Sequence, residues 1–480
     1  MEAHNSWKTP DEDRISFGNK VAYGLGAMVN NLLAGAIGAM MIVLNLGLGM
    51  DPAWVGLLGA LPRVTDAITD PLMGFISDRT RSKWGRRRPY IFIGAIAAGV
   101  LYAGLWQLYE GFSQTFYFVY FLVGSLLFYA AYTVFATPWV ALGYELTPDY
   151  HERTRLMGVQ NFIGQLAYVV TPWCLWIVSN KDFFPDQLTG SRWLAIVIGV
   201  FVAQIGIIPA LTLKERFTPT ESTDEDAGKT AAQVFGEFFV GFGQTLKSSS
   251  FLKLGLATFL VFNGFMLVSS FQFYVIIYYI FGGDEALGAK WAGWSGSLGA
   301  LSTFIVIMIV TWMATRIGKR KAFFVATGVS MVGYASKWFL YTPDVPWMLL
   351  LPAPLIAFGL GGLFTLMPSM IADVVDEDEL TTNERREGMY GSIFWWVVKV
   401  GMAGALAGGG FLLNATGFDV ELAGDQTVDT LTMMRIFDAF IPVVSSAIAI
   451  WAIVAYPITE KRALEIRAEL ESRRERSAAG

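Results

Sequence analysis

One apolar segment of the sequence carries three charged side chains at helical spacing. The segment reads GALPRVTDAITDPLMGFIS and contains Arg63, Asp66 and Asp70. On a helix, intervals of three and four residues place all three on one face. Two carboxylates one turn apart repel each other unless a cation lies between them, and their oxygens suit a hard cation. The pattern predicts a cation or proton site; the alternative is a structural cluster in which Arg63 neutralises one aspartate.

Other residues could complete such a site. Thr69 adds a hydroxyl beside the carboxylates, and Pro71, which has no backbone N–H, frees a local carbonyl. Lys399 lies deep in a second apolar segment, SIFWWVVKVGMAGAL. An ionised group at the bilayer centre costs about 2.5–3.5 kcal/mol on insertion scales. A lysine retained at such a position therefore indicates a functional role. We expect Lys399, with Arg63, to balance the aspartates and to couple cation binding to rearrangement.

For two lysines, extension of the side chain to the membrane interface is an alternative to a role inside the apolar segment. Lys399 could instead reach toward a membrane interface, although its depth in the segment opposes this. Lys337 lies closer to the end of its apolar segment, so its side chain is expected to be able to extend to the interface.

The composition shows why these charges must lie among apolar residues. Of the 480 residues, 54% are hydrophobic and 16% are charged, whereas soluble domains contain about 25% charged residues. The apolar content excludes a disordered chain, and the single cysteine, Cys174, excludes a disulfide scaffold. Two histidines are too few for a His-rich metal site, and a net charge of −5 gives no indication of nucleic-acid binding. We therefore expect an all-α membrane protein.

Twelve segments are long and apolar enough to cross a bilayer, which requires about 20 residues. They are 21–48, 52–77, 90–110, 115–145, 157–180, 192–213, 251–281, 291–314, 322–342, 346–375, 388–413 and 432–458. With both termini in the cytoplasm, 27 of the 35 Lys and Arg residues lie on the cytoplasmic side and three on the other. This bias predicts that orientation in a plasma membrane, the inner membrane of a bacterium.

The two halves of the sequence resemble each other. The fourth span ends FATPWVALGYELTPDYHERTRLMG and the tenth ends TLMPSMIADVVDEDELTTNERREGMYG, so each has a proline, an acidic cluster and Glu-Arg. Two six-helix halves related by a parallel repeat are typical of the major facilitator fold. We expect helical bundles at 1–213 and 251–458, a cytoplasmic linker at 214–250 and a cytoplasmic tail at 459–480.

Phenylalanines in the linker predict an amphipathic helix, either at the membrane interface or packed under a bundle. They are Phe235, Phe238, Phe239 and Phe242.

Charged residues at the cytoplasmic ends of the spans predict ionic locks that form and break as the halves move. They are Asp78, Arg79, Glu145, Arg153, Asp373 and Arg385. The alternative is that these charges only set the orientation of the chain.

Three separated stretches resemble one known family, the glycoside–pentoside–hexuronide:cation symporters, which include the melibiose carrier. DAITDPLMGFISDRTRSKWGRRRPYI resembles the family's second helix and following loop. YTVFATPWVALGYELTPDYHERTRL is similar to its fourth helix and loop, and IADVVDEDELTTNERREGMYGSIFWWVVKVG to its tenth loop and eleventh helix. The resemblance implies the major facilitator fold and import of a sugar or glycoside, coupled to Na⁺ or H⁺, by alternating access. It implies no enzyme activity and no cofactor beyond the coupling ion.

The resemblance also implies roles for single residues. Asp66, Asp70, Thr69 and Thr133 match the family's cation site, which would hold Na⁺ if the chain is sodium-coupled. Arg63 and Lys399 match its functional basic residues. Thr69 stands where the family often has Asn, which leaves the choice among Na⁺, Li⁺ and H⁺ open.

The sugar site departs from the family pattern. Charged sugar ligands of the melibiose carrier are matched here by Asn31, Ala136 and Asn161. Because charge-assisted hydrogen bonds are about twice as strong as neutral ones, the same sugar held in the same way is not expected. The candidates for substrate contact, each with helix packing as its alternative, are Asn30, Asn31, Gln160, Asn161, Gln272 and Trp395.

A cation-dependent carrier for a lysolipid or another amphiphile is the alternative function. The vertebrate sodium-dependent lysolipid carriers resemble distant members of the same group, and the seventh span is rich in aromatic residues. An enzyme is not supported, because no nucleophile–base arrangement is visible in the sequence. We expect a monomer in the lipid bilayer, with a small-molecule substrate and no nucleic-acid partner.

Overall fold

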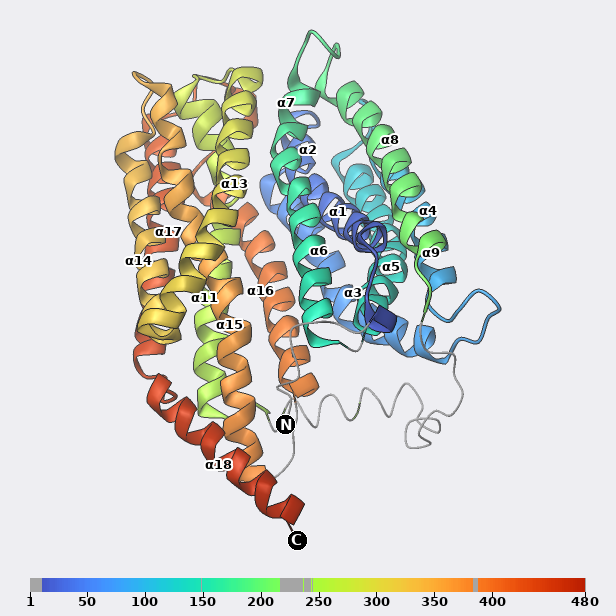
Figure 1. Cartoon of the computed structure of the whole chain (residues 1–480). Coiled ribbons are helices and arrows are strands. Elements are labelled where there is room, and N and C mark those ends of the chain that lie inside the picture. Colours follow the sequence, from blue (N-terminus) through green and yellow to red (C-terminus); the bar gives the residue numbers. More distant parts are fainter. Residues whose placement is uncertain are drawn as a thin grey trace. The chain divides into compact units, whose positions relative to one another are not determined.

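The structure is a computed structural model that describes residues 11–147, 149–215, 236, 243, 245–382 and 387–479. The regular elements of these residues are all helical, and the chain divides into two compact units, Met1–Ala231 and Ala232–Gly480 (Figure 1). The predicted all-α class is therefore confirmed. Most of the predicted linker, including its four phenylalanines, lies outside the described residues.

The first unit holds the first six predicted spans. After η1 (Asp11–Asp13), its helices are α1 (Phe17–Met40), α2 (Ile42–Leu46), α3 (Pro52–Arg79), α4 (Arg88–Leu105), α5 (Gln114–Glu145), α6 (Tyr150–Val170), η2 (Thr171–Trp173), α7 (Cys174–Ser179), α8 (Gln187–Gly206) and α9 (Ile208–Thr212). Side-chain oxygens of Asp51, Ser113 and Asp149 accept backbone N–H groups at the starts of α3, α5 and α6. Such caps satisfy donors that have no partner within the helix, and so fix where each helix begins.

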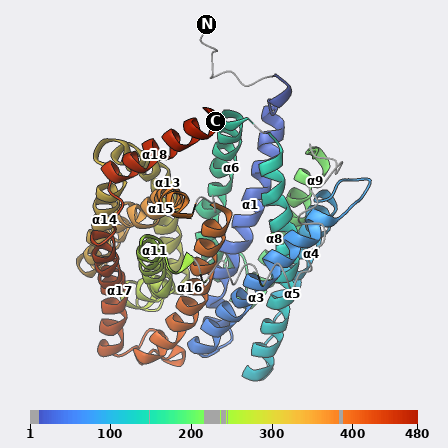
Figure 2. The ribbon, with the colours of Figure 1, turned by 90° about the horizontal axis from the view of Figure 1, so that it is seen from below.

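The second unit holds the last six spans and a terminal helix. Its helices are α11 (Ser249–Val268), α12 (Phe271–Tyr274), the π-helical η3 (Val275–Ile280), α13 (Glu285–Ile317), α14 (Lys319–Leu340), η4 (Pro346–Leu350), α15 (Pro352–Thr382), α16 (Glu387–Ala415), η5 (Val420–Leu422), α17 (Val428–Val454) and α18 (Glu460–Ala479). The predicted tail is thus largely helical. Figure 2 shows α18 running across the end of this unit, where Ile466 and Leu470 join the apolar core.

All twelve predicted spans correspond to helices. Ten meet a membrane-span criterion of length and apolar composition among the described residues. The other two, α3 and α14, have 28 and 22 residues, about 42 and 33 Å at the helical rise. Both exceed the hydrocarbon thickness of about 30 Å. Their polarity comes from charged residues, including Arg63, Asp66 and Asp70 on α3 and Lys337 on α14.

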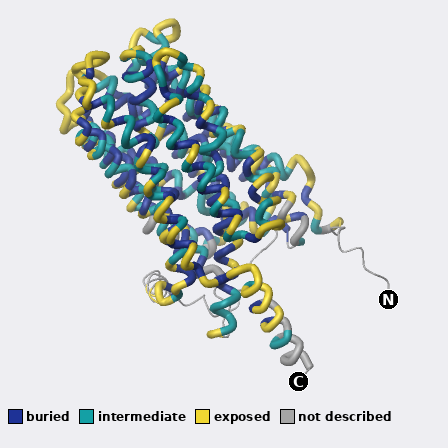
Figure 3. Tube along the Cα trace, turned by 90° about the vertical axis from the view of Figure 1, so that its left-hand side faces the viewer, coloured by how far each residue is buried: buried dark blue, intermediate teal, exposed yellow. Residues whose placement is uncertain are grey.

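Exposed apolar stripes mark surfaces that face lipid. Large side chains exposed by 44–64% recur at three- and four-residue intervals on α5 and α13. They are Phe116, Val119, Val123 and Leu127 on α5, and Leu301, Ile305, Met308 and Trp312 on α13. Exposed positions recur along the helices as well as in the loops (Figure 3). Water-soluble monomers rarely expose such continuous apolar surface, so these stripes are suited to a bilayer.

Helices α4 and α8 approach so closely that a side chain is excluded between them. A Cβ atom built on Gly99 would collide with the carbonyl oxygen of Gly199, and one built on Gly199 would collide with that of Gly99. Small residues allow this kind of close backbone contact between membrane helices.

We predict that Gly99→Leu destabilises the first unit by about 1–3 kcal/mol or more, because the helices must separate. The measurement is thermal unfolding of the purified protein, followed by tryptophan fluorescence. The matched control is Gly104→Leu on the same helix, where an added Cβ meets nothing within 4 Å. Equal melting temperatures for the two variants would contradict the prediction.

Candidate cation and substrate site

Arg63 and Asp66 form a buried ion pair within α3. Nη1 of Arg63 lies 3.4 Å from Oδ2 of Asp66, and the two side chains are 13% and 5% exposed. The guanidinium also lies over the ring of Tyr129 on α5, with 4.4 Å between Cζ and the ring centroid. A ring face attracts a cation most strongly where water is excluded. Arg63 therefore neutralises Asp66, as the structural alternative for this cluster predicted.

Asp70 is held differently, by hydroxyl groups. Thr133 on α5 donates to Oδ1 of Asp70 at 3.0 Å, and the hydroxyl oxygens of Thr69 and Thr133 lie 3.4 Å apart. Because α3 continues through Pro71, Asp66 and Asp70 stay one turn apart on one face, with about 5–6 Å between their Cβ atoms. The structure thus brings together the four residues predicted for the cation site.

The cluster combines two carboxylates and one guanidinium on α3 with neutral hydroxyl oxygens from α3 and α5. Carboxylate and hydroxyl oxygens are the ligands that hard cations prefer. Among the residues that the structure describes, no group of three or more His, Cys, Asp and Glu is placed to hold a metal ion.

A chain of polar side chains leads from this cluster to α1. Tyr132, next to Thr133, donates its hydroxyl to Oδ1 of Asn30 at 2.7 Å. Nδ2 of Asn30 donates to Oδ1 of Asn31 at 3.1 Å, and Nδ2 of Asn31 donates to the carbonyl of Gly164 on α6 at 3.0 Å. Asn30, a predicted substrate residue, thus bonds to the residue next to Thr133, and Asn31, another, bonds to Asn30. Gln160 is half-buried and Asn161 is exposed on α6, and in the described structure neither bonds to the Asn30–Asn31 pair.

The predicted residues of the second unit lie on α12 and α16. Gln272 follows a break after α11 and donates to Oγ of Ser295 on α13 at 3.3 Å. The π-helical η3 follows directly, and such turns occur frequently at functional sites. Trp395 is 50% exposed and stacks on Phe364, with centroids 5.9 Å apart. Lys399, half-buried, lies one turn further along α16.

The predicted gate acids have partners within their own units. Glu145 pairs with Arg86 and Arg87, and Asp373 pairs with Lys319 at 2.6 Å. Arg153 donates to the carbonyl of Thr147 at 3.1 Å, two residues after the end of α5. The side chains of Asp78 and Arg79, and Arg385 entirely, lie outside the described residues.

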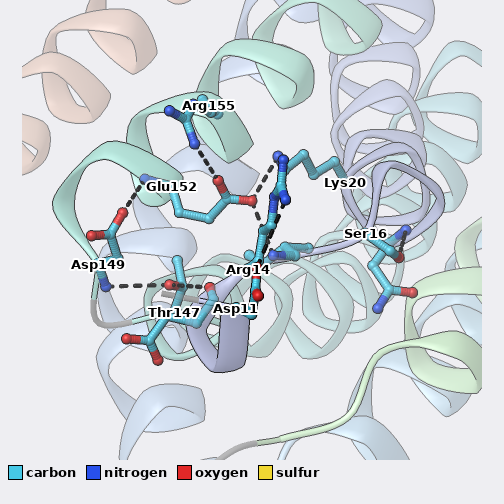
Figure 4. Close-up of polar contacts among 11 residues, drawn as sticks. Asp11, Arg14, Ser16, Lys20, Thr147, Asp149, Glu152 and Arg155 are labelled. Carbon is cyan, nitrogen blue, oxygen red and sulfur yellow. Dashed lines mark hydrogen bonds and ion pairs between the residues drawn. The ribbon is translucent and has the colours of Figure 1, made fainter. Parts of the chain in front are cut away.

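Glu152 is the centre of a polar cluster, although only the Glu-Arg pattern could be recognised from the sequence. Its buried carboxylate accepts from Lys20 at 2.7 Å, from Arg155 at 2.9 Å and from the backbone N–H of Ile15 at 3.0 Å (Figure 4). The cluster ties the segment before α1 to the start of α6. Burial raises the pKa of Glu152, but the hydrogen bonds from Lys20, Ile15 and Arg155 outweigh it and hold the pKa below its usual value.

Lys337 forms a buried ion pair that the sequence analysis missed. Its Nζ lies 2.8 and 3.0 Å from the two carboxylate oxygens of Asp438 on α17. Lys337 is 3% exposed and Asp438 1%, and the ammonium is 5.4 Å from the ring centroids of Tyr334 and Tyr341. The expectation that Lys337 extends to the interface was wrong, because α17 supplies a carboxylate inside the unit. An Asp inside the predicted span 432–458 was the available signal.

The fold and the site define a multi-pass membrane transporter of the major facilitator type. The family described as MFS/sugar transport protein matches residues 18–460. The chain belongs to this family, and it is a transporter rather than an enzyme. The family predicted from the three sequence stretches is confirmed.

Curated relatives align along almost the whole chain. An uncharacterized symporter of Synechocystis is 26% identical over 96% of this chain and 98% of the relative. A putative glycoside/cation symporter of Escherichia coli is 24% identical over 95% of each, and the isoprimeverose transporter of Lactiplantibacillus pentosus is 23% identical over 98% and 97%. The zebrafish sodium-dependent lysophosphatidylcholine symporter 1-A is 23% identical over 92% and 86%.

Solved structures show the same fold. A bacterial homolog of the lysosomal transporter Spinster, in an inward-facing conformation, has a TM-score of 0.65 and 14% identity, covering 95% of this chain and 97% of that one. A D-xylose-proton symporter has a TM-score of 0.59 and 13% identity, covering 90% and 95%. The predicted major facilitator fold, with two six-helix bundles, is confirmed.

Replacing Glu152 should change the acid side of the stability profile. Because the pKa of Glu152 is depressed in the folded state, its contribution is present above the ordinary value of 4.5 and is lost as the pH falls through the folded value. Glu152→Gln should therefore be less stable than wild type at neutral pH, with a difference that shrinks below about pH 4.5. Thermal unfolding across pH measures this, with exposed Glu110→Gln as control. A difference independent of pH would contradict the assignment.

The Lys337–Asp438 pair predicts a non-additive double-mutant cycle. Asp438→Leu leaves a buried ammonium without its carboxylate and should cost about 3–5 kcal/mol. The double variant Lys337→Met/Asp438→Leu removes both charges and should recover most of that loss. Melting temperatures of the two single variants, the double variant and wild type test this. A double variant less stable than Asp438→Leu would refute the pairing as the cause.

Proposed function

We propose that the chain is a cation-coupled importer of a sugar or glycoside that works by alternating access. The observation that carries the proposal is the cluster on α3 and α5, where Thr133 bonds to Asp70 beside the Arg63–Asp66 pair. An apolar helix retains two carboxylates at a cost in free energy, and the transport of a cation would explain why they are retained. Membership of a sugar transport family and the names of the glycoside/cation and isoprimeverose relatives support the substrate class.

The coupling ion in this proposal is Na⁺ or H⁺, bound by Asp66, Asp70, Thr69 and Thr133. Its entry reduces the repulsion between the two carboxylates. Tyr132, which follows Ala131 and precedes Thr133 in α5, bonds to Asn30, so a shift of α5 on ion binding would also move a polar group of α1. By linkage, a substrate that binds better to the ion-loaded protein must raise the affinity for the ion by the same factor.

Substrate contact is assigned to neutral polar groups and one ring. Asn30, Asn31, Gln160 and Asn161 come from the first unit, and Gln272 and Trp395 from the second. Hydroxyls of a sugar would bond to the amides, and the exposed ring of Trp395 would cover an apolar face of the sugar. Lys399, one turn from Trp395, and Arg63 are proposed to couple the two ligands.

The remaining assignments follow from the same mechanism. The bundles 1–213 and 251–458 would move about the substrate, joined by the linker 214–250. Glu145, Asp373 and Arg153, with Asp78, Arg79 and Arg385, would form the cytoplasmic gate ahead of the tail 459–480. We place both termini in the cytoplasm, in a bacterial inner membrane, because of the distribution of Lys and Arg. The transporter is proposed to act as a monomer.

A lysolipid or amphiphile carrier is the second candidate. It is favoured by the similarity to the lysophosphatidylcholine symporter and by the neutral residues at the expected sugar-binding positions. Uptake of radiolabelled glycosides and of radiolabelled lysophosphatidylcholine by the same proteoliposomes separates the two candidates.

Neutralising either aspartate should abolish gradient-driven transport. Asp66→Asn or Asp70→Asn removes the charge that attracts the cation, so cation-dependent accumulation of the substrate in vesicles should fall to the background level. Equilibration of substrate without a gradient can persist, because the sugar contacts remain.

The matched control is Asp51→Asn, an exposed aspartate at the start of the same helix, where Asn also serves as a cap. This variant should accumulate substrate as wild type does. Full gradient-driven accumulation by Asp66→Asn or by Asp70→Asn would defeat the proposed mechanism.

A further inference from the structure

A cavity of about 560 Å³ lies at one end of the second unit, remote in sequence from the residues assigned to the ion. It is open on one side and lined by the end of α13, the start of α14, the middle of α15 and the junction between α17 and α18. Its apolar lining comprises Ile317, Phe324, Met370, Tyr456, Ile458 and Leu464. A cavity of this size is within the range of sites that hold small organic ligands.

Basic residues surround this apolar lining. Lys319, Arg320, Lys321 and Lys461 line the cavity together with two acids, Asp373 and Glu460. Lys319 and Asp373 neutralise each other at 2.6 Å. Glu460 offsets one of the other three cations, so the rim keeps a net positive charge. The cavity therefore combines an apolar interior with a cationic edge, which is complementary to an anionic amphiphile.

The cationic residues are held in different ways. Arg320 donates to the carbonyl of Val454, the last residue of α17, where the helix dipole is negative. Lys321 and Lys461 are exposed, and Lys461 makes one long contact with Glu465 at 3.9 Å. Arg320 is therefore fixed in the structure, whereas the two lysines can turn toward a bound anion.

The surrounding surface places the cavity mouth at the level of lipid headgroups. Trp312 and Trp451, on α13 and α17, are 61% and 71% exposed. They lie five and three residues before the ends of their helices, about 8 and 5 Å along the axis. Exposed tryptophans are enriched where membrane meets water. Ile317 and Leu464, at the mouth, are also exposed, by 40% and 61%, so the opening is apolar as well as cationic.

We propose that this cavity binds an anionic glycerophospholipid of the surrounding membrane. The phosphate lies against Lys321, Lys461 and Arg320, and an acyl chain covers Ile317, Leu464 and the apolar lining. A free phosphate ion would use only the charged rim, and the exposed apolar mouth distinguishes the lipid from it. Basic pockets at the cytoplasmic ends of membrane helices hold anionic headgroups in this manner. The proposal is independent of which sugar and which ion the protein carries.

The test compares lipid retention by the intact purified protein. Native mass spectrometry measures binding of phosphatidylglycerol and of phosphatidylcholine with the same acyl chains. Wild type should retain phosphatidylglycerol selectively. Lys321→Gln/Lys461→Gln should weaken that binding by about tenfold or more, because two cations that attract the anionic headgroup are removed. Ala463→Trp, which fills the cavity and keeps every charge, should weaken it as well.

The control variant is Lys181→Gln/Lys290→Gln, which removes two exposed lysines that do not line the cavity. It should bind phosphatidylglycerol as wild type does. The same loss in control and test variants would overturn the proposal, because attraction would then depend only on overall charge. Unchanged binding by Ala463→Trp would also overturn it, as would displacement of the lipid by millimolar inorganic phosphate.

Discussion

The hydrogen bond from Thr133 to Asp70 is the contact on which the proposed mechanism depends. It joins α3 to α5 beside the two carboxylates of α3. The adjacent Arg63–Asp66 pair lies under the ring of Tyr129. Together these contacts place two carboxylates one turn apart beside hydroxyl oxygens, where a bound cation would reduce the repulsion between them.

Charge pairing is also the constraint that organises the rest of each unit. Glu145 with Arg86 and Arg87, Glu152 with Lys20, and Asp373 with Lys319 each join different elements. Lys337 and Asp438 do the same for α14 and α17 at a buried position. Breaking one partner of a buried pair costs far more than the pair contributes to stability. Such pairs therefore favour discrete arrangements of helices over gradual deformation, and alternating access requires discrete states.

The spans and the aspartate face could be predicted because their signals are local. Apolar length identifies a spanning helix, and three charges at helical spacing share a face whatever the helix packs against. Thr133 was placed in the site only through the resemblance to a family. Tyr129 and Tyr132 were missed, because their roles depend on how α5 is rotated against α3. Aromatic residues in an apolar span give no sign of that rotation.

The partners of charged residues were harder to predict than the charges. Lys337 and Asp438 are 101 residues apart in the chain, and only the packing of α14 against α17 makes them neighbours. A carboxylate retained in an apolar span was the signal that identified Asp66 and Asp70. The same signal is present at Asp438. Glu145 and Asp373 were expected to act in the gate, but Arg86, Arg87 and Lys319 were not named as their partners. Those partners depend on the conformation of the segment before α4 and on where α14 begins beside α15, which residue spacing does not encode.

The central claim is that Asp66 and Asp70 are ligands of a monovalent cation, and cation-dependent stability tests it most directly. The measurement is the melting temperature of purified wild type and Asp66→Asn/Asp70→Asn in sodium, lithium and choline salts, each across a pH series. The account predicts that sodium, lithium or protons stabilise wild type beyond choline by mass action, and that this selective stabilisation disappears in the double variant. An identical cation and pH response in the two proteins would contradict it.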